Sequence, residues 1–308
     1  MRTDPGSILV FGNVTLDVIC KTVDDVPRHD SIAFQDAAVT PGGCASNVAI
    51  DLARLGEKPL LAACMGDDQT ADILMDAWNE QGVDARFVKR IPDRGTGVSV
   101  GLVDSDLQPR FIHNSGANAE LVGETLNLDI FNEQGVGFMH IAGYFVLPGL
   151  LKPGFAETLA RIRKAGVFIS LDVVRSPAMK NPEPLWNILP NLDLFMCNLQ
   201  EAEIITGQSD PAGAASVFHE KGARPVIIKM GAEGCWLATL KQSVHIPGIP
   251  AEQLVDTTGA GDAFAAGVVS ALRQGMEIEE ACRFGAKQGA LTTGFLGAVR
   301  LDKNIEGL

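Results

Sequence analysis

From about residue 120 onward, short apolar runs alternate with longer stretches whose apolar residues recur at three- and four-residue spacing. The wider spacing predicts helices, and the continuous apolar runs predict strands that are buried on both faces. Strands and helices in alternation form right-handed βαβ units, so we expect a mostly parallel sheet covered by helices on both sides. The strands expected in this sheet are 7–13, 59–66, 137–142, 167–174, 193–198 and 225–230.

Two segments, at about 14–42 and 95–113, have a different character. They contain alternating short apolar runs without a helical period, which is typical of half-buried strands. The chain has no long polar linker that would separate two domains in series. We therefore predict one α/β domain over residues 1–308, with a small β-sheet lid, formed by 14–42 and 95–113, inserted into it.

Composition narrows the class of partner. Lys and Arg total 25 and Asp and Glu total 38, for a net charge of −13, which opposes binding to nucleic acid or to anionic lipid. No apolar run reaches the roughly 18 residues that span a membrane, and the first residues lack a signal-peptide layout. We expect a cytoplasmic protein with a small-molecule partner. The six cysteines form no C-x-x-C pair and are predicted to be buried thiols.

The strongest local signal lies at 255–275. Gly259, Ala260 and Gly261 precede a helix-forming run, so backbone N–H groups point outward at the positive end of a helix dipole. Such a helix start can bind an anion such as phosphate, and Asp262 places a carboxylate in its first turn. The alternative interpretation is that Asp262 only stabilises the helix N-terminus, because short glycine motifs also occur by chance.

The segment DTTGAGDAF at 256–264 resembles the C-terminal signature of the ribokinase family of carbohydrate kinases, also called the PfkB family. The segment PGGCASNVAIDLARLG at 41–56 is similar to the glycine-glycine signature of the same family. Five further segments agree in chain order: GNVTLD at 12–17, SGANAEL at 115–121, NLQE at 198–201, KMGAEG at 229–234 and ALTTGFLGAV at 290–299. The resemblance spans essentially the whole chain. It implies a ribokinase-like fold and transfer of the ATP γ-phosphoryl group to a hydroxyl of a sugar or sugar-like molecule.

The resemblance also implies roles for residues near the phosphates. Asp262 matches the general base, and the amides of Gly259, Ala260, Gly261 and Asp262 match the anion hole. Asn198 and Glu201 match the motif that organises Mg²⁺, largely through water, and the phosphates. Without the resemblance, these two residues would be interpreted as an Asn turn and a solvated Glu in a first helical turn.

Further matches concern the acceptor, the nucleotide and a cation. The residues that match sugar-binding positions are Asn13, Asp17, Gly42, Gly43 and Asn47. Those that match nucleotide-binding positions are Asn198, Lys229, Gly231 and Gly234. Asp256 and Thr258 resemble positions that help bind a monovalent cation such as K⁺ in some members. The cofactors implied are therefore Mg²⁺, ATP as co-substrate and, in some members, K⁺.

The chain departs from the family pattern at several positions. Cys44 follows the glycine pair where ribokinase proper has Lys, so ribose is not the favoured acceptor. Val174 replaces the Asn of an Asp-x-Asn-x-Arg stretch found in several sugar and sugar-acid kinases, and Arg175 could face an acidic substrate, a phosphate or solvent. His113, His140 and Tyr144 fall where members line the acceptor pocket, but each fits a packed core position equally well.

Two alternatives to a sugar kinase stay open. A nucleoside kinase of the family would stack the base on aromatic residues of the lid, and the aromatic content of 6% favours a sugar instead. A non-catalytic sugar- or nucleotide-binding regulator is disfavoured because Asp262, both glycines and NLQE are all present. Exposed strand edges on the lid tend to pair between subunits, which favours a homodimer.

Overall fold

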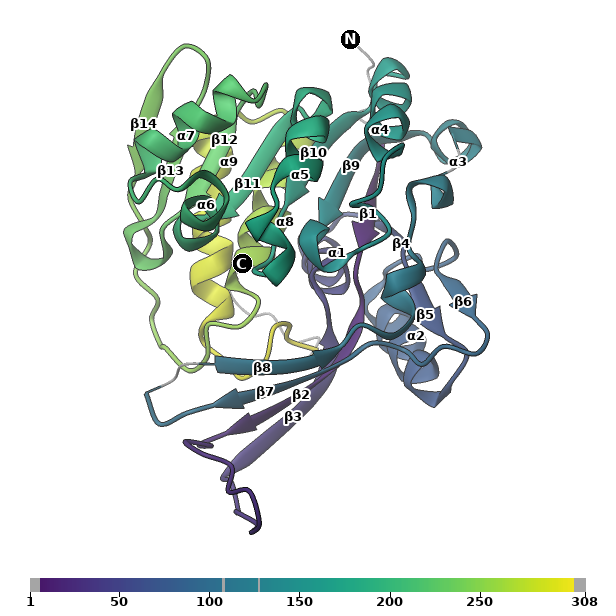
Figure 1. The fold of residues 1–308 in the computed structure, drawn as a ribbon, viewed down its shortest axis with the longest axis vertical. Coiled ribbons are helices and arrows are strands. Elements are labelled where there is room, and N and C mark those ends of the chain that lie inside the picture. The colour runs from purple at the N-terminus through teal and green to yellow at the C-terminus, as the bar shows by residue number, and fades with distance from the viewer. Residues whose placement is uncertain (1–5, 107–108, 127, 302–308) are drawn as a thin grey trace.

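The computed structural model describes residues 6–106, 109–126 and 128–301, in which the largest element is an eight-stranded, mostly parallel sheet (Figure 1). Its strand order is β14-β13-β12-β11-β10-β9-β1-β4. The strands are β1 (Ser7–Gly12), β4 (Leu60–Ala62), β9 (Val136–Ala142), β10 (Phe168–Asp172), β11 (Leu194–Asn198), β12 (Val226–Lys229), β13 (Cys235–Ala238) and β14 (Ser243–Ile246). Neighbouring strands from β4 to β12 pair in parallel, and β13 and β14 add an antiparallel edge.

Helices cover both faces of this sheet. Successive side chains of a strand point to opposite faces, and since the central strands are apolar on both, each face needs a covering layer. On β9, Met139 and Ile141 pack into one helix layer, and Phe138 and Ala142 pack into the other. The first layer contains α3 (Leu128–Glu133), α4 (Phe155–Lys164), α5 (Glu183–Ile188), α6 (Leu199–Thr206) and α7 (Pro211–Glu220). The second contains α1 (Cys44–Arg54), α2 (Gln69–Gln81), α8 (Ala260–Arg273) and α9 (Ile278–Thr292). The predicted α/β architecture is confirmed.

One predicted strand is divided between two sheets. The prediction that 59–66 lies wholly in the main sheet is wrong for its second half, which forms β5 (Cys64–Gly66) and pairs with β6 (Lys89–Ile91) in a separate sheet. Strand β1 ends at Gly12, and its pairing with β4 stops at Phe11 and Ala62. The backbone that follows β4 therefore has no partner in the main sheet. The carbonyl of Ala63 accepts instead from the amide of Lys89 at 2.9 Å.

A second, four-stranded sheet lies beside one end of the large sheet, in the order β3-β2-β7-β8 (Figure 1). Its strands are β2 (Thr15–Lys21), β3 (Asp36–Gly42), β7 (Val98–Val103) and β8 (Pro109–Asn114). They come from the two segments that the sequence predicted to stand apart from the α/β body, of which residues 107 and 108 lie outside the described residues. Strand β1 leads through Asn13 and Val14 into β2, so the small sheet leaves the body at the carboxyl end of β1.

The described residues also bear on the thiols and on membrane insertion. All six cysteines are free, and five are buried as predicted, whereas Cys44 is half-buried at the start of α1.

None of the helices within the described ranges is both long and apolar enough to cross a membrane.

Candidate active site

The N-termini of α1 and α8 meet beside the carboxyl ends of the central strands. Neither helix has a side-chain cap, whereas Asp68 and Asp210 cap α2 and α7. Asn47, in the first turn of α1, donates a hydrogen bond of 2.7 Å from Nδ2 to Oδ2 of Asp262 in the first turn of α8. Two residues that the sequence assigned to different roles are therefore in direct contact.

Asp262 has the electrostatics of a base that titrates near neutrality. The pKa of its carboxyl is raised to about 7, mainly by burial, and the negative charge of Asp172 contributes to this rise. Hydrogen bonds from Asn47 and Cys44 and the charge of Lys229 act in the opposite direction. A general base is most effective when its pKa lies close to the working pH, so this environment suits proton abstraction.

The start of α8 presents backbone N–H groups to the same space. Gly259 has φ 78°, and a side chain there would also approach the carbonyl oxygen of Ala298 to 2.4 Å, so this position requires glycine. The first helical bond runs from the Ala263 amide to the Gly259 carbonyl at 2.9 Å, which leaves the preceding first-turn amides without helical acceptors. The Ala260 amide differs from the expected anion hole, because it donates to the Thr257 carbonyl at 3.3 Å.

Asp17 lies on β2 of the small sheet. It is buried, its Oδ1 accepts a hydrogen bond of 2.6 Å from the Thr15 hydroxyl, and burial raises its pKa to about 6. A side chain on Gly42 would come within 1.9 Å of the Asp17 carboxyl carbon. Gly42 therefore makes room for the carboxylate, which is a role that the two-glycine motif did not reveal by itself.

Two buried amide oxygens in this region have no hydrogen-bond donor among the described residues. They are Oδ1 of Asn13 and Oδ1 of Asn47. The Asn13 oxygen lies 2.1 Å from the position that a side chain on Gly143 would occupy, and a side chain on Gly43 would meet the Asn13 carbonyl at 2.7 Å. Because a buried acceptor without a donor is costly, both oxygens are suited to accept from a bound ligand.

Asn198 and Glu201 form a reciprocal cap at the start of α6. Oδ1 of Asn198 accepts from the Glu201 amide at 2.9 Å, and Oε2 of Glu201 accepts from the Asn198 amide at 2.8 Å. The structure thus confirms an Asn turn but not a solvated Glu, since Glu201 is only 3% exposed. Burial raises the pKa of Glu201 to about 7, with Lys229 opposing and Asp172 reinforcing the shift.

Lys229 is half-buried at the edge of the large sheet rather than extended into solvent. It ends β12, its side chain is 13% exposed, and it forms an ion pair with Asp172, the last residue of β10. Asp172 is a further candidate site residue, which was not selected from the sequence. The available signal was its place at the end of a buried strand within Asp172-Val173-Val174-Arg175.

The remaining predicted residues serve loop geometry in this structure. Gly234, with φ 93°, lies where a side chain would meet the Ile246 carbonyl at 2.1 Å, and Gly231, with φ 60°, faces open space. Asp256 is fully buried, accepts from the Thr258 amide and hydroxyl at 2.9 and 2.7 Å, and accepts from the Gly297 amide at 2.9 Å. The described residues contain no cluster of three His, Cys, Asp or Glu side chains that could hold a metal ion.

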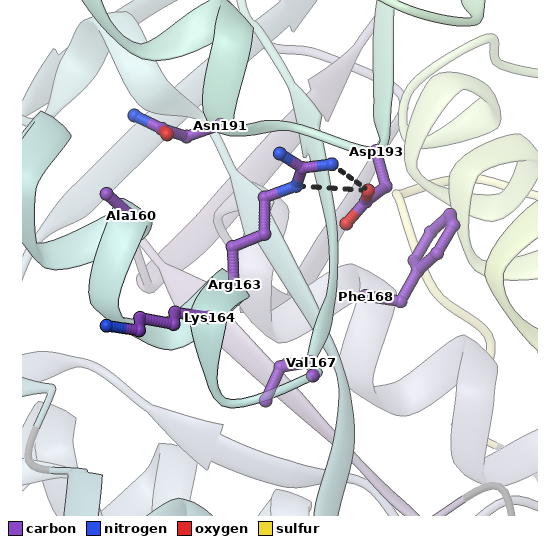
Figure 2. Close-up of a pocket in the computed structure, with 8 residues that line it drawn as sticks. Ala160, Arg163, Lys164, Val167, Phe168, Asn191 and Asp193 are labelled. Carbon is purple, nitrogen blue, oxygen red and sulfur yellow. Dashed lines mark hydrogen bonds and ion pairs between the residues drawn. The ribbon is translucent and has the colours of Figure 1, made fainter.

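A surface hollow elsewhere is distant from this chemistry. It lies near the amino end of β10, where Arg163 of α4 reaches Asp193 (Figure 2). The guanidinium nitrogens Nε and Nη2 of Arg163 are each 3.3 Å from Oδ1 of Asp193, and Oδ2 accepts from the Ile169 amide at 3.0 Å. Because both charged groups already have partners, the arrangement stabilises the connection between α4 and β11.

Comparison with known proteins gives a consistent result. Residues 6–303 match the family described as pfkB family carbohydrate kinase. The chain is 27% identical over 298 residues to a ribokinase of Haemophilus influenzae (strain ATCC 51907 / DSM 11121 / KW20 / Rd), covering 95% of this chain and 94% of the relative. It is 32% identical over 260 residues to the 2-dehydro-3-deoxygluconokinase of Bacillus subtilis (strain 168), covering 81% and 79%. The structure of Arabidopsis thaliana ribokinase complexed with ribose and ATP matches with a TM-score of 0.80 and 26% identity, over 95% of this chain and 94% of that one.

Proposed function

The chain belongs to the pfkB family of carbohydrate kinases, and we propose that it transfers the γ-phosphoryl group of ATP to a hydroxyl of a sugar-like acceptor. The observation that carries this proposal is the contact between Asn47 and Asp262 at the meeting point of two helix N-termini. A carboxylate with a raised pKa there lies beside amides suited to the transferred oxygens. Base and anion site are thus provided by the same helical turn.

In the proposed reaction, Asp262 takes the proton of the acceptor hydroxyl as its oxygen attacks the γ-phosphorus. The bond from that phosphorus to the bridging oxygen breaks, and ADP leaves with the electron pair. First-turn amides of α8, at Gly261 and Asp262, bind the transferred oxygens, with Gly259 setting the start of the helix. Phosphoryl transfer depends mainly on alignment and charge stabilisation, so few side chains need to react.

The acceptor would bind between the small sheet and the body. Asp17, Asn13 and Asn47 supply oxygen acceptors for its hydroxyl groups. In the part of the chain that the structure describes, the buried Oδ1 atoms of Asn13 and Asn47 accept from no donor. Gly42 and Gly43 keep the floor free of side chains. A sugar hydroxyl both donates and accepts, so a set of amides and a carboxylate can satisfy it fully.

The nucleotide side is assigned to the carboxyl ends of β11 and β12. Glu201 and Asn198 would orient Mg²⁺ through its water shell, because buried carboxylate and amide oxygens are the donors that this ion prefers. When bound, Mg²⁺ neutralises charge on the phosphates. The turn around Gly231 and Gly234 would lie against the nucleotide. Both carboxylate oxygens of Asp256 already accept hydrogen bonds from backbone amides. A role for Asp256 in binding K⁺ therefore has no support beyond the resemblance.

An ADP-release assay over sugars, sugar acids, polyols and nucleosides tests the proposed function. We expect release with one acceptor class, and we expect Asp262→Asn to lower kcat at least 100-fold while calorimetry shows nearly unchanged ATP binding. Asp72→Asn, on the exposed side of α2, is the matched control. Near-normal turnover in Asp262→Asn would reject the assigned base, and ATP binding without transfer to any acceptor would favour a regulator.

A sugar acid is the second candidate acceptor. The similarity to a 2-dehydro-3-deoxygluconokinase favours it, and Arg175 lies exposed just beyond the carboxyl end of β10. A guanidinium pairs well with a carboxylate. If the sugar acid is the acceptor, Arg175→Gln raises its KM, whereas the KM for ATP stays the same.

Two neighbouring rows of side chains cross the small sheet, a polar row on its inner face and an apolar row on its outer face, and we propose that the sheet acts both as a lid and as a dimer contact. The register aligns Asp17 with Thr40, Ser99 and His113 on the inner face. The outer row contains Val18, Val39, Val100 and Ile112. Val39 is 58% and Ile112 is 67% exposed, and a second copy of the same row would bury both.

A further inference from the structure

Lys229 spans the carboxyl edge of the large sheet. Its partner Asp172 ends β10, and β11 lies between β10 and β12. Two strands of separation correspond to roughly 10 Å, so the lysine side chain must extend across the end of β11 to form the ion pair. This places the ammonium group above the sheet edge, within the candidate active site, and away from the turn at Gly231 and Gly234.

The ammonium group also lies against the start of α8. A side chain on Gly261 would come within 3.3 Å of Lys229 Nζ. A cation is unfavourable at the N-terminus of a helix, because the helix dipole is positive at that end. The arrangement therefore combines two sources of positive potential, the first-turn amides and the ammonium, in one place.

Carboxylates keep the lysine charged in this position. Burial alone would lower the pKa of Lys229, but the charges of Asp172 and Glu201 raise it above its usual value. Asp172 is itself only 7% exposed at its side chain. A buried ion pair often stabilises a fold no more than well-packed apolar side chains would, so stability gives no strong reason for it.

We propose that Lys229 is a catalytic residue whose ammonium binds an oxygen of the transferred phosphoryl group, and that Asp172 is the residue that positions it. The proposal rests on the proposed kinase function and deepens it. Lys229 forms no covalent bond and keeps its protons during transfer. It stabilises negative charge on the phosphoryl oxygens from the side opposite to the carboxylate that holds it.

The first test is Lys229→Met, with Lys241→Met on an exposed turn as the matched control. We expect kcat to fall at least 100-fold in Lys229→Met, because that is the order of loss when one preorganised donor is removed. The KM for the acceptor and the affinity for ADP should change less than about threefold, because the ammonium acts on the transferred group. Turnover equal to that of the control would overturn the proposal.

The double variant Lys229→Met/Asp172→Asn distinguishes a catalytic role of Lys229 from a role in neutralising Asp172. It also removes the carboxylate that loses its ion-pair partner in the single variant and would destabilise it. We expect the double variant to melt within a few degrees of the wild type and to stay at least 100-fold below it in kcat. Recovery to within about threefold would show that Lys229 only neutralises Asp172, and would overturn the proposal. A wild-type protein that transfers phosphoryl to no acceptor would instead reject the kinase function and this proposal together.

Discussion

Asp262 occupies an environment that opposes its ionisation and yet provides specific partners for the ionised form. Burial is the largest influence on its pKa, which rises to about 7, and the hydrogen bond from Asn47 limits the rise. The same bond fixes the orientation of the carboxylate. Under the proposed function, Asn47 would therefore connect acceptor recognition with the strength of the base.

The pH dependence of kcat/KM follows from this environment. Because Asp262 must be deprotonated to accept a proton, we expect kcat/KM to rise with pH and reach half its plateau near pH 7. Asn47→Ala removes a bond that favours the charged form, so the midpoint should move up by about one pH unit. The exposed Asn79→Ala is the control. An unchanged midpoint in Asn47→Ala would contradict the assignment.

At the level of elements, the first turn of α8 depends on one glycine. Gly259 combines a positive φ with a backbone neighbour that leaves no room for a side chain. Gly275, at the other end of the same helix, also has positive φ, at 83°, but faces open space. A comparison of substitutions at Gly259 and Gly275 therefore separates the cost of a positive φ from the cost of a steric conflict.

Alanine substitutions at these glycines should differ. Gly275→Ala should lower the free energy of unfolding by about 1 kcal/mol, which is the usual cost of a left-handed conformation, without loss of activity. Gly259→Ala should lower it by about 2 kcal/mol or more and reduce kcat about 100-fold, because the helix start must shift. Urea denaturation and ADP-release assays measure both effects. Equal kinetics in the two variants would show that the position of the first turn is unimportant.

For the whole molecule, the apolar row of the small sheet predicts self-association. Val39→Asp or Ile112→Asp would place a charge in the paired surface, so sedimentation velocity should show a dimer for the wild type and a monomer for each variant. The control is Ile73→Asp on α2, because Ile73 is 50% exposed and lies outside the small sheet. A monomeric wild-type protein would contradict the proposed contact.

Closure of the small sheet would be a motion of the whole molecule. We expect X-ray scattering to show a smaller radius of gyration once ATP analogue and acceptor are both bound, because closure excludes water from the transferred group. Asp17→Asn should weaken this change, since Asp17 lies on the inner face. Identical scattering in the free and doubly bound protein would count against a lid.

The periodicity of the sequence was sufficient to predict the α/β body, because strand and helix patterns depend on residues close together in the chain. Periodicity also predicted the separate character of 14–42 and 95–113, and the glycines at 259–261 before a helix-forming run predicted the start of α8. Tertiary structure alone decided which distant residues meet. The Asn47 and Asp262 contact joins positions 215 residues apart, and the Lys229 and Asp172 pair depends on strand order.

The same reason explains what the sequence alone did not predict. The division of 59–66 follows from where β1 ends. The burial of Glu201 and the partial burial of Lys229 follow from how α6, α8 and three strands converge. Local pattern determines which residues form elements and which turns require glycine. Pairing, burial and charge environment depend on contacts across the whole fold, and for this protein those contacts decide which of the predicted polar residues lie together in one site.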